Sequence, residues 1–170
     1  MHPQIKSVAD MYAFASMALG PVVSDLSDEE AGRRSRNGEG NSITFLVGHL
    51  LSSRLGLLKR FGETTENPFA ELFGGDASAQ DASAYPPIRE LAASWREVAV
   101  RFQATLESLT EEQLSEPAEG YPVPDQTARG GLMFMAWHEA YHVGQIGMLR
   151  TELGKPSLQA RLREAMTEDR

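Results

Sequence analysis

Two histidines, His138 and His142, stand four residues apart in a segment whose apolar residues recur at helical spacing. On an α-helix, residues at i and i+4 project from one face on successive turns, so these two imidazoles can bind a single metal ion. Glu139 lies between them, and the string from 138 to 142 matches H-E-x-x-H, in which the glutamate is the general base of zinc peptidases. The spacing therefore predicts metal chemistry.

A third histidine, His49, lies in another strongly apolar segment, and of the four histidines only His2 falls outside a predicted helix. Burying three imidazoles without a shared partner would leave several donors and acceptors unsatisfied, whereas one cation accepts three nitrogen lone pairs at once. We therefore expect one divalent metal ion bound by His49, His138 and His142. The alternative, three ordinary histidines hydrogen-bonded within a core, stays open at this point.

Several further polar residues fall close to these histidines in the sequence. Ser53 follows His49 by one helical turn, and Tyr141 and Gln145 flank His142, so all three are candidates to line a substrate pocket. Tyr141 could equally be a packing residue, and Gln145 could equally be a polar residue whose hydrogen bonds are made within the fold.

Arg54 and Arg150 lie on the two predicted helices that carry the histidines. They could pair with an anionic cosubstrate, although ion pairing on the helix surface is the role that we favour for both.

Four segments have helical periodicity, and none has the alternation of a strand. They span residues 4–19, 43–61, 86–109 and 127–154, with Gly20-Pro21 expected to end the first and Pro86-Pro87 to begin the third. The 62–85 segment is long and rich in small residues, so it can cross the whole bundle and let helices two and three run parallel. We expect an all-α fold in one domain, 1–170: a four-helix bundle, up-down-down-up, with a long crossover between helices 2 and 3.

Two short segments contain a capping box, in which a hydroxyl and a side chain three residues later satisfy each other's backbone donors. The pairs are Ser27 with Glu30 and Thr110 with Gln113, and each predicts a short helical turn. Beyond the fourth helix, the residues from 161 to 170 read as a polar tail.

The composition excludes several classes of function. The formal net charge is −8, which disfavours binding to nucleic acid. Because the chain has no cysteine, disulfides, cysteine-ligated zinc and a cysteine nucleophile are excluded. No apolar stretch approaches the ~18 residues of a membrane span, and no secretory signal is visible at the N-terminus. We therefore expect a cytoplasmic protein that binds neither nucleic acid nor membrane.

Two motifs resemble a known family, the DinB-like superfamily. Residues 136–150, AWHEAYHVGQIGMLR, resemble the signature of the family's last helix, and residues 42–50, SITFLVGHL, resemble its second-helix motif. The resemblance implies a four-helix bundle with a three-histidine site for nickel or zinc, for which His49, His138 and His142 carry over as ligands, and a homodimer. Characterised relatives include transferases and isomerases that use a low-molecular-weight thiol.

Three hypotheses about function follow. The first is a metal-dependent thiol S-transferase acting on small electrophilic molecules, with the sulfur supplied by a thiol cosubstrate. The second is a metal-dependent hydrolase with Glu139 as general base. Against a peptidase, His49 lies far upstream, Glu164 is in the polar tail, and Glu139 is about 100° round the helix from His138. The third is a non-enzymatic, stress-related protein whose metal stabilises the bundle.

Overall fold

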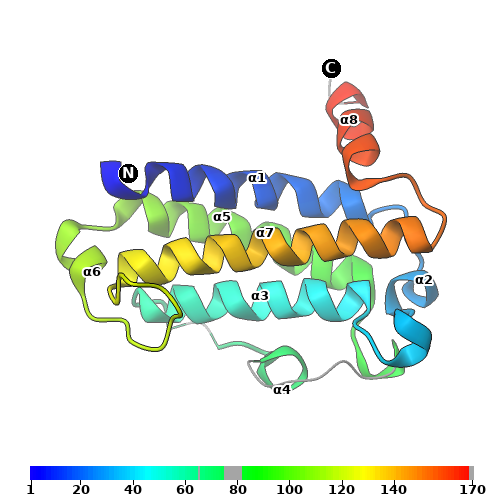
Figure 1. The fold of residues 1–170 in the computed structure, drawn as a ribbon, viewed down its shortest axis with the longest axis horizontal. Coiled ribbons are helices and arrows are strands. Elements are labelled where there is room, and N and C mark those ends of the chain that lie inside the picture. Colours follow the sequence, from blue (N-terminus) through cyan, green and yellow to red (C-terminus); the bar gives the residue numbers. More distant parts are fainter. Residues whose placement is uncertain (65, 75–81, 169–170) are drawn as a thin grey trace.

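Four long helices form the body of the molecule. The computed structural model describes residues 1–64, 66–74 and 82–168. The long helices are α1 (Lys6–Val23), α3 (Ile43–Arg60), α5 (Ile88–Ser108) and α7 (Ala128–Glu152). In Figure 1, α1 and α7 run in one direction and α3 and α5 in the other, which confirms the up-down-down-up four-helix bundle. Helices α1 and α3 each pack against α5 and α7, so they occupy opposite corners.

Short elements join the long helices. They are η1 (Pro3–Ile5), α2 (Asp28–Gly32), η2 (Arg36–Gly38), α4 (Ala70–Phe73), η3 (Ala82–Ala84), α6 (Glu111–Ser115) and α8 (Leu158–Glu168). Both predicted capping boxes are present, with Ser27 and Thr110 capping α2 and α6. The crossover from α3 to α5 carries α4 and η3, while its residues 65 and 75–81 lie outside the described residues. At its end Asp28 of α2 accepts from the first backbone N–H of α5, that of Ile88, at 2.8 Å.

Helix α1 does not end at Gly20-Pro21, as the sequence had suggested, but continues to Val23. A proline within a helix removes one hydrogen bond and crowds the preceding turn. Here two features offset that cost. Val22 and Val23 are buried in the core, and the carbonyls of Pro21 and Val22 accept hydrogen bonds from Arg161 and Arg150. Positive charge at a helix C-terminus also favours the helix dipole.

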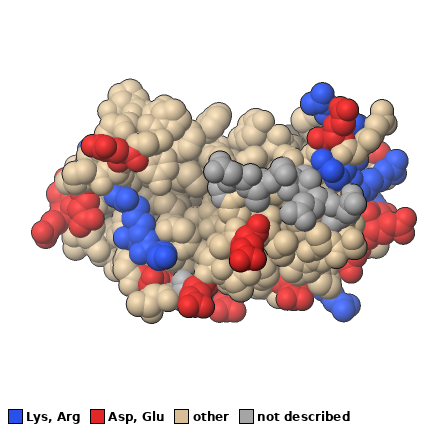
Figure 2. All heavy atoms as spheres, turned by 90° about the horizontal axis from the view of Figure 1, so that it is seen from below, with Lys and Arg blue, Asp and Glu red and all other residues tan. Residues whose placement is uncertain are grey.

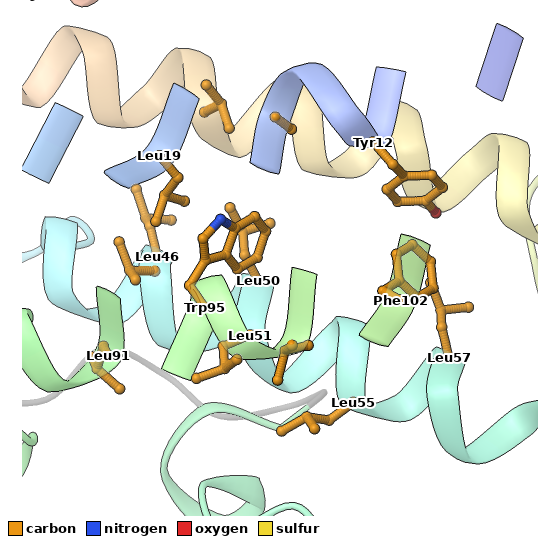
Figure 3. Close-up of a cluster of buried hydrophobic side chains, with 14 of the residues drawn as sticks. Tyr12, Leu19, Leu46, Leu50, Leu51, Leu55, Leu57, Leu91, Trp95 and Phe102 are labelled. Atoms are coloured by element: carbon orange, nitrogen blue, oxygen red, sulfur yellow. The ribbon is translucent and has the colours of Figure 1, made fainter. Parts of the chain in front are cut away.

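The core lies between α1, α3 and α5, and its centre is Trp95, which is fully buried (Figure 3). Tyr12 of α1 meets Phe102 of α5 edge to face, with ring centroids 4.8 Å apart. The Tyr12 hydroxyl donates to the carbonyl of Leu132 at 3.0 Å and so ties α1 to α7. Helix α3 is buried nearly all round, as its apolar sequence predicted. It is therefore a rigid support for any side chain that it presents.

The predicted polar tail is wrong, because residues 158–168 form helix α8. Gly154, at φ +73°, ends α7 where the sequence placed the stop. Beyond it, Leu158 and Leu162 pack against the core, while Arg161 bonds the end of α1. Arg163 and Glu164 are exposed, and the high charge of the segment concealed its helical period, whose apolar positions are Leu158 and Leu162.

The surface carries charges of both signs. On the face viewed in Figure 2, acidic and basic side chains are intermixed at the two ends of the bundle, and acidic side chains also lie near the middle and along the lower edge. Within the described part of the chain, no helix combines the length and the apolarity that crossing a bilayer requires.

Candidate metal centre

The structure brings His49, His138 and His142 together between α3 and α7. The Nε2 atom of His138 lies 3.2 Å from Nε2 of His49 and 3.0 Å from Nε2 of His142. All three ligand atoms lie within 4.8 Å of one another, and the three side chains are half-buried. His138 and His142 meet as the four-residue spacing predicted, and His49 reaches them from the neighbouring antiparallel helix.

Outer hydrogen bonds fix the protonation of two of the rings. His49 Nδ1 lies 3.2 Å from the carbonyl oxygen of Phe73, and His142 Nδ1 lies 2.6 Å from Oε1 of Gln145. Both oxygens can only accept, so each Nδ1 carries the proton and each Nε2 presents a lone pair. Two lone pairs therefore point at His138 Nε2, which has one proton at most and can satisfy one of them.

His138 itself has an unsatisfied nitrogen. Its Nδ1 is buried and has no hydrogen-bond partner within the described residues. If Nδ1 carries the proton, as in the other two rings, three lone pairs face one another without a donor. A cation at their centre removes that repulsion. With metal–nitrogen bonds of about 2.0–2.1 Å, ligand nitrogens stand roughly 2.9 Å apart at right angles and roughly 3.4 Å apart in a tetrahedron. The observed separations of 3.0 and 3.2 Å fall in this range, so the residues fit a metal ion.

The electrostatics of the cluster also favour neutral imidazoles. Burial, followed by the charges that His142 and His49 would carry, lowers the pKa of His138 from 6.5 to about 4. Burial likewise lowers the pKa of His142, against the opposing effect of the hydrogen bond that its Nδ1–H donates to Gln145. A ring must be free of its second proton to bind a metal. Both rings are in that state at neutral pH.

The crossover segment positions His49. Phe73 of α4 is fully buried and stacks on Tyr85 with centroids 5.0 Å apart, so its carbonyl is firmly placed. Its ring lies directly over Gly48, where a Cβ would come within 2.5 Å of three ring atoms. Only glycine at position 48 lets Phe73 approach α3 this closely. Nothing in the sequence identified Phe73 as the residue that packs over Gly48.

Glu139, considered above as a catalytic base, lies in the core and not with the histidines. Its carboxylate accepts two hydrogen bonds from Arg54, at 3.0 Å from Nε and 2.5 Å from Nη2. Burial raises the pKa of Glu139, and the Arg54 guanidinium opposes that rise. The reason is the helix period, since a residue one step from His138 is turned by about 100° and here faces the interior. Glu139 is therefore the buried ion-pair partner of Arg54.

The surface roles expected for Arg54 and Arg150 are also wrong, because both guanidinium groups are buried. Arg54 also donates to Ser16 Oγ at 2.7 Å and lies 3.9 Å over the ring of Trp95. Arg150 donates to both carboxylate oxygens of Asp25, at 2.6 and 3.0 Å. Each arginine joins α1 to another long helix, so neither is free to bind a cosubstrate.

The three candidate pocket residues differ in their contacts with the histidines. Gln145 bonds His142 and also donates from Nε2 to the Tyr141 hydroxyl at 3.1 Å, while Tyr141 is half exposed. Ser53 is partly buried one turn from His49, and among the described residues no hydrogen bond joins it to the histidines. Gln145 is therefore an outer partner of the site, and Tyr141 lies at its rim.

Tyr141 was a predicted pocket residue, but the aromatic row to which it belongs, with Trp137 and Phe134, was missed by the sequence reasoning. Trp137 stacks on Tyr141 with centroids 5.8 Å apart and planes 19° apart, and Phe134 lies 5.6 Å from Trp137. Tyr141 in turn contacts the His142 ring at 5.1 Å. Trp137 and Tyr141 are 57% and 52% exposed, respectively. Their exposure could have been suspected from the helix period, because both lie off the buried seam of α7.

Comparisons with known proteins agree with this architecture. The sequence profile of the DinB superfamily matches residues 11–146. A DinB-like protein from Bacillus cereus ATCC 10987 superposes with a TM-score of 0.67 at 17% identity, covering 90% of this chain and 95% of that one. YfiT from Bacillus subtilis, described as a probable metal-dependent hydrolase with an unusual four-helix bundle topology, superposes with a TM-score of 0.59 at 20% identity, covering 92% and 91%. No curated protein sequence matches the chain.

Proposed function

Because the chain belongs to the DinB superfamily and three of its imidazoles converge on one point, we propose that it is a metal-dependent thiol S-transferase acting on small electrophilic molecules. The observation that carries the proposal is the make-up of the cluster formed by His49, His138 and His142. The cluster consists of three imidazole nitrogens, and among the described residues no carboxylate belongs to it. Three protein ligands leave a position open, as catalytic sites require.

When bound, a divalent ion supplies an acidic position at which a coordinated thiol or water loses its proton. A thiol needs no further base there, because its ordinary pKa is already near 8.5. Water is far less acidic, and the carboxylate that assists it in zinc peptidases is here held by Arg54 in the core. The residues present therefore suit a sulfur nucleophile better than peptidase-like hydrolysis.

The chain's own groups orient the ligands and receive the electrophile. Phe73 O and Gln145 Oε1 hold two imidazoles with their Nε2 atoms toward the centre. The exposed rings of Trp137 and Tyr141 offer a flat apolar surface next to His142, on which an organic electrophile can pack. In the reaction the sulfur–carbon bond forms, the carbon–leaving-group bond breaks, the leaving group keeps its electron pair, and the thiol proton passes to solvent.

The second candidate is a metal-dependent hydrolase. It is supported by the three-histidine ligand set, which also suits activation of water, and by the description of YfiT as a probable metal-dependent hydrolase. In this chain Glu139 would have to leave Arg54 to act as a base. A non-enzymatic metal protein is the weaker alternative, since a purely structural ion prefers four protein ligands.

The test begins with elemental analysis of untagged protein, which also distinguishes zinc from nickel. The loaded protein is then assayed with a thiol and chlorodinitrobenzene, and separately with ester and amide substrates. We expect a metal-dependent rate with the thiol that His49→Ala abolishes and that His2→Ala, outside the cluster, leaves unchanged. Metal-dependent ester or amide turnover without thiol transfer would instead establish the hydrolase. The homodimer stays a prediction, which light scattering of the same protein tests.

A further inference from the structure

Helix α1 is apolar on its outer face as well as on its inner one. No charged residue lies between Asp10 and Asp25, and the outward-facing side chains of Met11, Phe14 and Met17 are about half exposed. A surface helix ordinarily turns polar and charged residues to the solvent, and one that is apolar all round is buried on most sides. Helix α3 is such a helix and is buried. The outer face of α1, in contrast, is left uncovered by the described part of the chain.

The adjoining surface of α7 has the same character. Helices α1 and α7 lie side by side along the bundle (Figure 1). Between residues 130 and 149 the only acidic residue is Glu139, which is buried, and there is no lysine or arginine. The exposed residues of this stretch are therefore uncharged: Met133, Trp137, Ala140, Tyr141, Gly144 and Met148. Their spacings of three, four and seven residues turn most of them toward one side of the helix.

These residues and the outer side of α1 form one surface, the α1–α7 face, which consists of Met11, Phe14 and the six exposed residues of α7. Its six large side chains are 45–66% exposed and leave on the order of 700 Å² in solvent. The largest apolar patch of an ordinary monomer is about 300–600 Å², and each partner of a standard interface contributes about 800 Å². The α1–α7 face thus has the size of one side of a protein interface.

A groove runs between the two helices within this face. It has a volume of about 400 Å³, and its walls are Ser7, Asp10, Met11, Phe14 and Ala15 of α1 with Ala136, Ala140 and Val143 of α7. The α7 side is made of small residues, whereas Phe14 stands at the edge with half of its surface in solvent. A protruding ring beside a hollow is self-complementary. A second copy turned by a twofold axis places its Phe14 in this groove and receives the first copy's Phe14 in its own.

One end of the groove is already covered by a helix of the same chain. Leu158 of α8 lies 3.2 Å from the position that a Cβ would occupy on Gly147 of α7, and Arg161 of α8 donates to the carbonyl of Pro21 in α1. In Figure 1, α8 stands only at this end of the bundle. The surface between α1 and α7 therefore accepts a packed helix, and most of its length is still open to one from another molecule.

The charge of the chain restricts where two copies can meet. At a formal net charge of −8 they repel each other, and least where neither presents a charged side chain. The one charged residue of the groove, Asp10, is paired with Lys6 at 3.2 Å. We propose that two copies of this chain associate through their α1–α7 faces about a twofold axis, with Phe14 of each in the groove of the other. Trp137 is then removed from water, and the second copy bounds one side of the aromatic surface beside the histidines.

Sedimentation velocity of the purified protein, with and without chelator, tests the proposal. We expect a dimer with a Kd of about 1 µM or less. Ala140→Glu places a carboxylate in the groove of both copies and should raise that Kd at least about 100-fold. Val100→Glu is the matched control, because it adds the same charge at a 73% exposed position of α5 outside the face, and it should leave the Kd unchanged.

A second pair of variants tests the packing without adding charge. Phe14→Ala should raise the Kd at least about tenfold, whereas Met17→Ala, on the side of α1 that faces α5, should not. Circular dichroism checks that each variant is folded. Trp137 supplies an independent signal, because the other tryptophan, Trp95, is fully buried in the monomer. Its emission should shift to shorter wavelength in the parent dimer relative to Ala140→Glu.

Two results would overturn the assignment. The first is a parent protein that stays monomeric up to about 100 µM, since an interface of standard size gives a Kd at or below the micromolar range. The second is a dimer that Ala140→Glu and Phe14→Ala leave intact, or that Val100→Glu disrupts as strongly as Ala140→Glu does, because either would place the contact elsewhere on the bundle.

Discussion

Two polar clusters lie side by side between α3 and α7, and they differ in how well they are satisfied. His138 and Glu139 are neighbours on α7, and their partners on α3 are His49 and Arg54. In the core, Glu139 and Arg54 meet through two hydrogen bonds, and Arg54 has further acceptors in Ser16 and Tyr12. In the histidine cluster, the Nε2 atoms of the three rings face one another, and His138 Nδ1 has no partner among the described residues.

The difference separates structure from function. A buried ion pair whose hydrogen-bonding groups are all used holds helices together and has no capacity left for a ligand. A cluster whose acceptors face each other is unfavourable by itself and becomes favourable when a cation enters. The H-E-x-x-H pattern thus divides in this chain, with its histidines assigned to the metal and its glutamate to the core.

The largest expected effect is on stability, from breaking the core pair. Glu139→Gln leaves the buried Arg54 charge uncompensated and should lower the free energy of unfolding by about 3–5 kcal/mol. The double variant Arg54→Met with Glu139→Met should recover much of that loss, since no unpaired charge remains. Urea denaturation measures both. Metal bound per folded chain should stay at the parent level in Glu139→Gln, and a loss of metal with unchanged stability would place Glu139 in the site.

The second prediction concerns the metal and the histidines. An ion that binds only the folded chain stabilises it by about 2.7 kcal/mol at a hundredfold excess over Kd. We expect this gain in the parent protein and its absence in His138→Ala, as measured by thermal unfolding with and without zinc. His2→Ala is the matched control, because His2 pairs with Glu111 of α6 and does not belong to the cluster. An equal zinc response in all three proteins would disprove the centre.

The third prediction compares the two outer hydrogen bonds of the site. Loss of such a partner typically costs 10–100-fold in metal affinity, or about 1.4–2.7 kcal/mol. Gln145→Ala removes the acceptor of His142 without disturbing packing, so affinity should fall at nearly constant stability. Gly48→Ala pushes Phe73 away, so metal affinity and stability should fall together. Competition with a chromophoric chelator and urea denaturation measure the two quantities. If Gly48→Ala changed stability alone, Phe73 would not orient His49.

The sequence predicted the parts of this molecule that local chemistry determines. Periodicity, caps and the spacing of His138 and His142 depend on residues close in the chain, and the helices and capping boxes follow them. The contacts that the sequence did not predict connect distant segments. Arg54 was expected at the surface because its partners Glu139 and Ser16 lie 85 and 38 residues away. The continuation of α1 through Pro21 depends in the same way on arginines near the other end of the chain.

The smallest expected effect is the pH dependence of the metal-free protein. His138 titrates at 6.5 when unfolded and at about 4 when folded, chiefly because it is buried. Between these values the unfolded chain binds more protons, so stability is full above pH 6.5 and is lost as pH falls toward 4. The shift corresponds to about 3 kcal/mol, which solvent screening of a half-buried ring reduces to about 1–2 kcal/mol.

Urea midpoints of chelator-treated protein at pH 7.5 and 4.5 measure this loss of stability. The raised pKa of Glu139 acts in the opposite direction, so the decisive quantity is the difference between parent and His138→Gln. Identical pH profiles for the two proteins would show that the cluster carries no electrostatic cost, and the contrast with the core pair would disappear.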